Sequence, residues 1–154
     1  MITDREWLDI AWKYFQQHAQ QRVQHFNFFI TLSAILSTGL LTTFQSDLQA
    51  PLVGIGIGLI QAQVSFIFYK IDNRNRFLTK LSENVLKRLE LDTIGNAYKL
   101  FTEEEKITLL LNKSDKSRMF FNRQFGHGQL YRIVFITFFI VGISGSILSL
   151  WQLL

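Results

Sequence analysis

The chain has 154 residues, a length typical of one domain. It contains 15 Phe, one Pro and no Cys, and 18% of its residues are charged. This composition excludes a disordered chain, a disulfide framework and any site built on cysteine thiolates. The net charge of +4 predicts contact with phosphate groups of nucleic acid or of anionic lipid, and the positions of the charges decide between the two.

Residues 1–25 predict a cytoplasmic amphipathic helix. Thr3 and Glu6 stand at the spacing of a capping box, so we expect the helix to begin near Asp4. No Gly or Pro occurs before Gly39, and the simplest expectation is one helix of about 40 residues that continues into the bilayer. The acidic residues near its start argue against a cleavable signal peptide.

Three long apolar runs predict three transmembrane helices, at about residues 26–44, 51–69 and 131–154. Each run has roughly the 20 residues that a helix needs to cross a hydrocarbon core about 30 Å thick. A short connection before Pro51 joins the first two spans into a hairpin over residues 26–69. The predicted fold class is an all-α integral membrane protein with three transmembrane helices and long helical cytoplasmic extensions.

Residues 70–130 are predicted to form a helical cytoplasmic segment. The second helix of the hairpin continues past Tyr69 without a breaker, and turn residues end it near Gly95. A second capping box at Thr102 predicts a short helix. The basic and aromatic stretch after Ser114 predicts an interfacial helix on the inner leaflet, directly before the third span.

Apolar stripes at helical spacing predict that the two cytoplasmic extensions cover each other. The stripe on the first helix consists of Leu8, Ala11, Trp12, Phe15, Ala19 and Val23. The stripe on the second consists of Leu78, Leu81, Val85 and Leu89.

The distribution of Lys and Arg predicts the orientation in the membrane. Most of the 16 basic residues lie in residues 70–132, and none lies in the hairpin tip or after the third span. We therefore expect an inner (plasma) membrane protein whose N-terminus and residues 70–130 are cytoplasmic and whose C-terminus is outside. The same basic surplus can face anionic lipid, so the lipid bilayer is the expected partner and direct nucleic-acid binding is not expected.

Catalytic patterns are missing from the sequence. It contains no P-loop, nucleophile elbow or dinucleotide-binding pattern, and no carboxylate lies within the three spans. His18 and His25 share a helix face with Arg22 between them, but they lack the further ligands that a metal site needs. We expect no enzyme, no metal site and no cofactor.

Small residues at four-residue spacing predict close helix packing in lipid. They are Gly54, Gly58 and Ala62 in the second span, and two pairs in the third, Gly142 with Ser146 and Gly145 with Ser149. Two interpretations remain open: these ridges pack the three helices of one chain together, or they form the seam of a homo-oligomer.

Polar residues at membrane depth are candidates for the lining of a pore or of its vestibule. Gln61 and Gln63 point away from each other on a helix, so they cannot both face one lumen. Gln61 is nearer to the small-residue ridge, so we expect it to be sealed in a helix contact. The candidate lining residues are Gln63, Asn27, His18, Arg22 and His25.

The cytoplasmic helix, the tight two-span hairpin and the long helical extension, over residues 3–91, resemble the SLATT domains of bacterial anti-phage systems. The arrangement is also similar to small membrane accessory proteins encoded beside RNA-targeting CRISPR nucleases. The resemblance implies an oligomer that opens a pore or depolarises the inner membrane when a partner senses infection. We therefore expect a non-enzymatic, homo-oligomeric effector; the alternative is a membrane tether or scaffold that recruits a soluble partner through its cytoplasmic helices.

Overall fold

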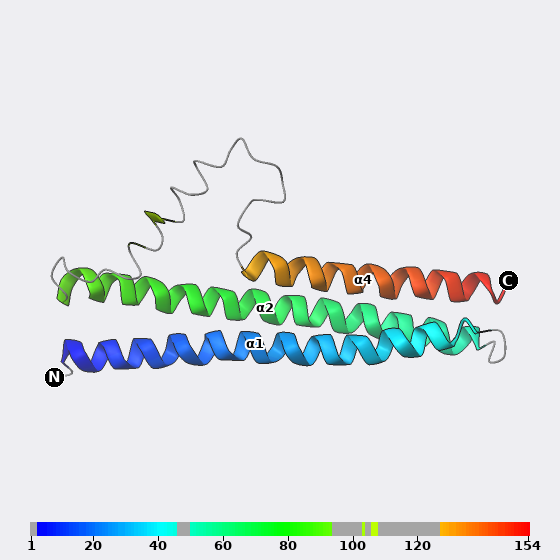
Figure 1. Cartoon of the computed structure of the whole chain (residues 1–154), viewed down its shortest axis with the longest axis horizontal. Coiled ribbons are helices and arrows are strands. Elements are labelled where there is room, and N and C mark those ends of the chain that lie inside the picture. The colour runs from blue at the N-terminus through cyan, green and yellow to red at the C-terminus, as the bar shows by residue number, and fades with distance from the viewer. Residues whose placement is uncertain (1–2, 46–49, 94–102, 104–105, 108–126) are drawn as a thin grey trace. The chain divides into compact units, whose positions relative to one another are not determined.

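The computed structural model describes residues 3–45, 50–93, 103, 106–107 and 127–154. These residues form three long helices, α1 (Asp4–Thr42), α2 (Pro51–Thr93) and α4 (His127–Trp151), and no strand occurs among them (Figure 1). All three helices are long and apolar enough to cross a membrane, with mean hydropathies of 1.3, 1.7 and 2.4 over their most apolar windows. The prediction of an all-α protein with three membrane-spanning helices is confirmed.

The start of α1 is the predicted capping box. The backbone N–H of Thr3 donates to Glu6 Oε2 at 2.7 Å, and the backbone N–H of Glu6 donates to Thr3 Oγ1 at 3.4 Å. The hydrogen bond from the Thr3 backbone, and to a lesser extent the one from the Thr3 side chain, lower the pKa of Glu6, because they favour its charged form. α1 then runs for 39 residues, and α2 begins at Pro51 as predicted.

The described helices belong to two compact units. One unit holds residues 1–21 and 75–126, and the other, called here the membrane unit, holds residues 22–74 and 127–154. The predicted capping box at Thr102 and the predicted interfacial helix after Ser114 lie outside the described residues.

In the first unit, the buried face of α2 is mostly polar. Ser82, Leu86 and Glu90 are buried, whereas Leu81 and Val85 of the predicted stripe are 49% and 41% exposed. The prediction that those two residues are buried was therefore wrong. The hydroxyl of Ser82 donates to carbonyls of its own helix, so this side chain can be buried without a partner from another element.

The α1 stripe in this unit is also only partly covered. Ala11 is buried, and Leu8 and Phe15 are half-buried. Trp12 is 46% exposed, although its ring stacks on Phe15 with the centroids 5.8 Å apart. Ala11 is thus the most deeply packed residue of the stripe.

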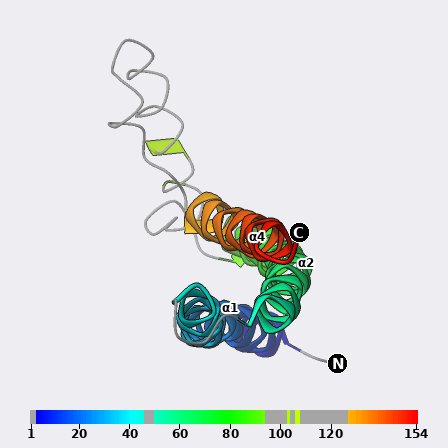
Figure 2. The same cartoon turned by 90° about the vertical axis from the view of Figure 1, so that its right-hand side faces the viewer.

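In the membrane unit, an aromatic cluster joins the three helices. Phe29 of α1 is fully buried, and its ring lies 5.4 Å from that of Phe68 on α2. The same ring lies 4.7 Å from Phe135 and 5.6 Å from Phe138 on α4. Figure 2 looks from the hairpin end and shows that α2 is next to both α1 and α4. Phe29 therefore lies where all three helices meet.

The backbones of α2 and α4 touch at two glycines. A Cβ added to Gly58 would lie 2.6 Å from the carbonyl oxygen of Gly142 and 2.9 Å from the backbone nitrogen of Ser146. A Cβ added to Gly142 would lie 2.6 Å from the carbonyl oxygen of Gly58 and 2.7 Å from the nitrogen of Ala62. The hydroxyl of Ser146 donates across this contact to the carbonyl of Ile55 at 3.2 Å. Only glycine fits at positions 58 and 142.

The other small residues predicted from the sequence also meet helices of the same chain. Gly54 packs beside Ser149 of α4 and Thr43, which follows α1. Gly145 packs against the side chain of Leu40 on α1. The small-residue ridges are thus occupied within one chain, and a role for them in an oligomer seam stays a prediction.

Replacing Gly58 by Leu should separate α2 from α4, because the nearest atoms are backbone atoms that cannot move aside. We expect the free energy of unfolding to fall by about 3 kcal/mol or more. Leu59→Ala is the control, since Leu59 is 53% exposed and its loss should cost less than about 1 kcal/mol. Thermal unfolding of the detergent-solubilised protein measures both, and equal stabilities would contradict the close contact.

Candidate functional site

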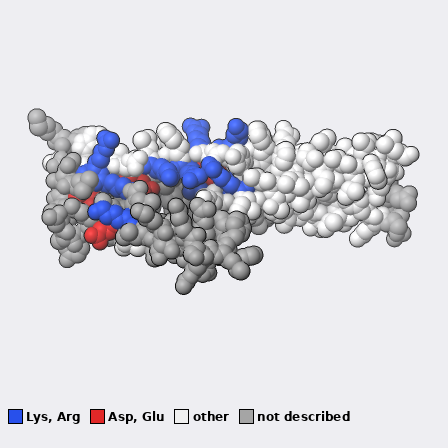
Figure 3. Space-filling view, turned by 90° about the horizontal axis from the view of Figure 1, so that it is seen from above, with Lys and Arg blue, Asp and Glu red and all other residues white. Residues whose placement is uncertain are grey.

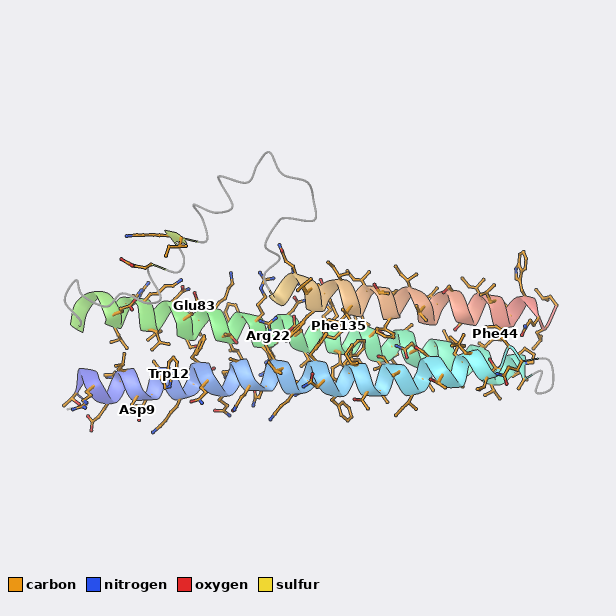
Figure 4. All side chains as sticks on the ribbon, viewed as in Figure 1. Asp9, Trp12, Arg22, Phe44, Glu83 and Phe135 are labelled. Atoms are coloured by element: carbon orange, nitrogen blue, oxygen red, sulfur yellow. The ribbon has the colours of Figure 1, made fainter. Side chains whose placement is uncertain are left out.

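A bidentate ion pair joins α1 to α2 in the membrane unit. Arg22 Nε donates to Asp72 Oδ1 at 2.8 Å, and Arg22 Nη2 donates to Asp72 Oδ2 at 3.3 Å. The two side chains are only 15% and 4% exposed. Figure 4 shows Arg22 between α1 and α2. The charge of Arg22 is therefore compensated inside the chain.

The first turns of α4 complete this cluster, which we call the polar layer: Arg22, Asp72, Asn73, Tyr131 and Arg132. Arg132 Nη2 donates to Asn73 Oδ1 at 2.6 Å. The guanidinium carbon of Arg22 lies 5.4 Å from the centre of the Tyr131 ring, a cation–π distance. The polar layer contains two Arg and one carboxylate, so it carries a net positive charge.

The polar layer lies at one end of the uncharged spans. Figure 3 shows the basic side chains gathered beyond the white, uncharged surface of the spans. Phe26 is one turn from Arg22, and its ring stacks on Tyr131 at 4.0 Å with an angle of 10° between the planes. Aromatic packing therefore begins directly beside the ion pair, and it limits the access of water to the pair.

The pairing of Arg22 with Asp72 was not predicted, although the sequence carries a signal for it. The two residues are equidistant in sequence from Asp47, in the tip of the hairpin. Antiparallel helices bring such positions to the same level. Asp72 lies just beyond the second span, outside the apolar runs that predict the spans.

His18, Arg22 and His25 differ in their burial and in their contacts. His18 is half-buried, and its ring packs edge-on against Tyr14 with the centroids 4.3 Å apart. Arg22 turns to Asp72, and His25 is exposed. Among the described residues, no three His, Asp or Glu side chains are close enough to hold a metal ion together.

The two glutamines of α2 differ in burial as predicted. Gln61 is fully buried, as predicted, and its Nε2 donates to Ser65 Oγ of the same helix at 3.4 Å. Gln63 is exposed on the outer surface of the membrane unit, as is Asn27 on α1. A pore-lining role for Gln63 and Asn27 stays a prediction.

An unbroken line of small or polar residues follows the exposed side of α1 through its span. We call it the α1 polar line; its members are Asn27, Thr31, Ala34, Thr38 and Thr42, all exposed. They recur at intervals of three or four residues, so they share one helix face. The hydroxyls of Thr31, Thr38 and Thr42 donate to carbonyls of their own helix, at 3.1, 2.9 and 2.7 Å. Their oxygen lone pairs remain available to water.

Comparison with known families identifies a match over nearly the whole chain. Residues 5–151 match the model of the octameric membrane protein family. The chain belongs to this family. Membership supports a homo-oligomer in a membrane, and it covers α4 together with the α1–α2 hairpin.

A curated relative of this octameric membrane family protein comes from Escherichia coli. It is called CD-NTase-associated protein 19 and is 32% identical over 139 residues, which cover 90% of this chain and 85% of the relative. No solved structure matches the chain. The comparisons do not confirm the narrower resemblance to SLATT domains.

Removing one partner of the Arg22–Asp72 pair should destabilise this octameric membrane family protein strongly, because the other charge stays buried. We expect Asp72→Asn and Arg22→Gln each to lower the free energy of unfolding by about 3 to 5 kcal/mol. The double variant Arg22→Met with Asp72→Leu should recover most of the loss. Thermal unfolding in detergent tests this, and additive effects of the two single losses in the double variant would contradict it.

Proposed function

We propose that the chain is a homo-octameric, non-enzymatic inner-membrane effector of a CD-NTase-associated anti-phage system. Its oligomer would conduct ions or otherwise perturb the membrane. The octamer number follows the name of the family, and the defence context follows the name of the E. coli relative and the resemblance to small membrane effectors. The observation that carries the conducting role is the α1 polar line.

The three helices differ in what their exposed faces offer to the surroundings. On α4 the exposed face carries Ile133, Ile136, Ile140 and Ile147, each 50% exposed or more, with the hydroxyls of Thr137 and Ser144 between them. The α1 polar line contains no large apolar side chain, whereas Phe28, Ile35 and Leu41 at other exposed positions of α1 are 62%, 64% and 67% exposed. Because lipid favours apolar surface, α4 is suited to face lipid, and the α1 polar line is the part of α1 suited to face the centre of a ring.

The mean hydropathies of the helices agree with α4 facing lipid and α1 facing the axis. They fall from 2.4 for α4 to 1.7 for α2 and 1.3 for α1. Leu59, Ile60 and Ile67 on the exposed face of α2 are apolar, and Gln63 lies among them. In a ring with α1 at the axis, this face of α2 is available to a neighbouring protomer.

A conduit lined by the α1 polar line needs no titratable group within the span. Water can bind to the Thr hydroxyls and to the amide of Asn27, which the bilayer cannot satisfy. Gln63 and the exposed His25 remain candidates for the lining or the vestibule. Half-buried His18 and paired Arg22 would contribute there only after rearrangement, since both are engaged within the chain.

Cysteine substitution tests which helix faces water, because the native chain contains no Cys. Thr31→Cys and Thr38→Cys should react with a charged, membrane-impermeant thiosulfonate at least about tenfold faster than Ile140→Cys, since only a hydrated thiol ionises readily. In planar bilayers the same reaction should reduce the conductance of the two α1 variants.

Ile140 is the matched control, because it lies at a similar depth. Phe29 contacts Phe138, and Leu40 contacts Gly145, so Ile140 lies between these two levels, as Thr31 and Thr38 do. Absence of any conductance in the wild-type oligomer would remove the conducting role. Conductance that is insensitive to labelling at both Thr positions would place the conduit elsewhere.

The proposed orientation has the N-terminus in the cytoplasm and the C-terminus outside. The basic residues beside the spans carry this proposal, because Lys and Arg favour the cytoplasmic side. Alkaline phosphatase fused after Leu154 should be active, and a green fluorescent protein at the same position should be dark. The reverse pattern would show that the chain has the opposite orientation.

A further inference from the structure

A groove between α2 and α4 opens on the exposed surface of the membrane unit. Its volume is about 240 Å³, and the residues that line it are Ser65, Phe66, Tyr69, Phe135, Ile136 and Phe139. The hydroxyl of Ser65 donates to the carbonyl of Gln61 at 2.8 Å, so this polar group is satisfied within the helix. The groove is therefore an apolar channel between aromatic side chains, of the kind that an alkyl chain fills.

Two cationic side chains adjoin the end of this groove that is nearest the polar layer. Lys70 is exposed, follows Tyr69 directly, and places its Nζ 5.4 Å from the centre of the Phe66 ring. Arg132 is one turn before Phe135 and Ile136, so it shares their side of α4. The groove therefore has apolar walls and a basic end.

Neither cation is neutralised by the described part of the chain. Among the described residues of the membrane unit, Asp72 is the single acidic residue, and it is buried in its ion pair with Arg22. Arg132 donates from Nη2 to the neutral amide of Asn73, and its buried Nε has no hydrogen-bond partner among the described residues. Both Lys70 and Arg132 can accept an anion without breaking an ion pair.

We propose that this groove binds one anionic phospholipid of the leaflet that adjoins the polar layer. An acyl chain lies along the aromatic walls, and the phosphate is bound by Lys70 and Arg132. Lys70 in the middle of α2 and Arg132 in the first turns of α4, beside an apolar groove, match the two parts of such a lipid, its charge and its alkyl chain. The site stands apart from conduction, because the α1 polar line takes no part in it.

A neighbouring copy of the chain fits this groove less well. It would have to bring a carboxylate to the level of Lys70 and Arg132, and the described carboxylate at that level, Asp72, is only 4% exposed and already paired. A lipid supplies the negative charge and the apolar chain in one molecule. Charge complementarity therefore selects the lipid as the occupant.

Native mass spectrometry of the purified oligomer in a neutral detergent tests the proposal. Dioleoylphosphatidylglycerol and dioleoylphosphatidylcholine have the same acyl chains, so their comparison isolates the head group. We expect the anionic lipid to bind at least about tenfold more tightly, because its glycerol head group leaves the phosphate charge free for Lys70 and Arg132, whereas the choline cation of the other lipid offsets that charge. Dihexanoylphosphatidylglycerol isolates the acyl chain and should bind at least about tenfold more weakly than the dioleoyl form.

Charge variants locate the site. Lys70→Gln and Arg132→Gln should each reduce the preference for the anionic lipid by about fivefold or more. The matched control is Arg88→Gln, which removes the same charge from an exposed position further along α2 and should leave the preference unchanged. Arg132 also donates a hydrogen bond to Asn73, so Arg132→Gln can disturb assembly. In that case the lipid preference of Lys70→Gln alone tests the site.

Three results would overturn the proposal. They are equal binding of the two dioleoyl lipids, equal binding of the dihexanoyl and dioleoyl anionic lipids, and a preference that Lys70→Gln leaves intact. The first removes the head-group site, the second removes the groove, and the third moves the anion to other basic residues. None of these results depends on whether the oligomer conducts ions.

Discussion

The contact between the backbones of α2 and α4 at Gly58 and Gly142 determines how the membrane unit packs. At this point neither helix has a side chain, so Ser146 can donate a hydrogen bond to a carbonyl of α2. Further along the same two helices, the side chains of Phe66 and Phe135 are aromatic rings instead of the single hydrogen of glycine, and the groove lies there. The helices α2 and α4 are thus in close contact where their residues are small, and they are separated by a groove where their residues are large.

The helix α1 joins the other two through aromatic rings, and it exposes hydroxyls. Phe29 is fully buried against α2 and α4, whereas Thr31 and Thr38 are exposed on the same helix. A helix surrounded by lipid would gain little from that distribution, since lipid offers no partner to a polar side chain. The distribution supports a ring in which α1 is closest to the axis. In the proposed ring, the α1 polar line would face water and the exposed face of α4 would face lipid.

The sequence predicts the elements of this protein better than their partners. Apolar length, the capping box at Thr3 and the position of Pro51 are local signals, and all three were predicted correctly. Burial of Leu81 and Val85 was predicted wrongly, because helical spacing defines a face and does not say which face another element covers. Spacing in the same way identified the small-residue ridges but left open whether one chain or two would fill them. The Arg22–Asp72 pair needs the register of the hairpin, which becomes visible only when the two helices are aligned from their common tip.

The position of the Arg22–Asp72 pair bears on how the chain enters the membrane during synthesis. An isolated charged residue raises the free energy of inserting a helix by up to about 2.5 to 3.5 kcal/mol, depending on its depth. Arg22 and Asp72 lie just beyond the two predicted spans, so neither charge has to enter the hydrocarbon core. Their pairing holds α1 and α2 in register at the membrane surface and leaves insertion to the apolar residues of the spans. α4, which has the highest mean hydropathy, can enter on its own and dock onto a hairpin that is already formed.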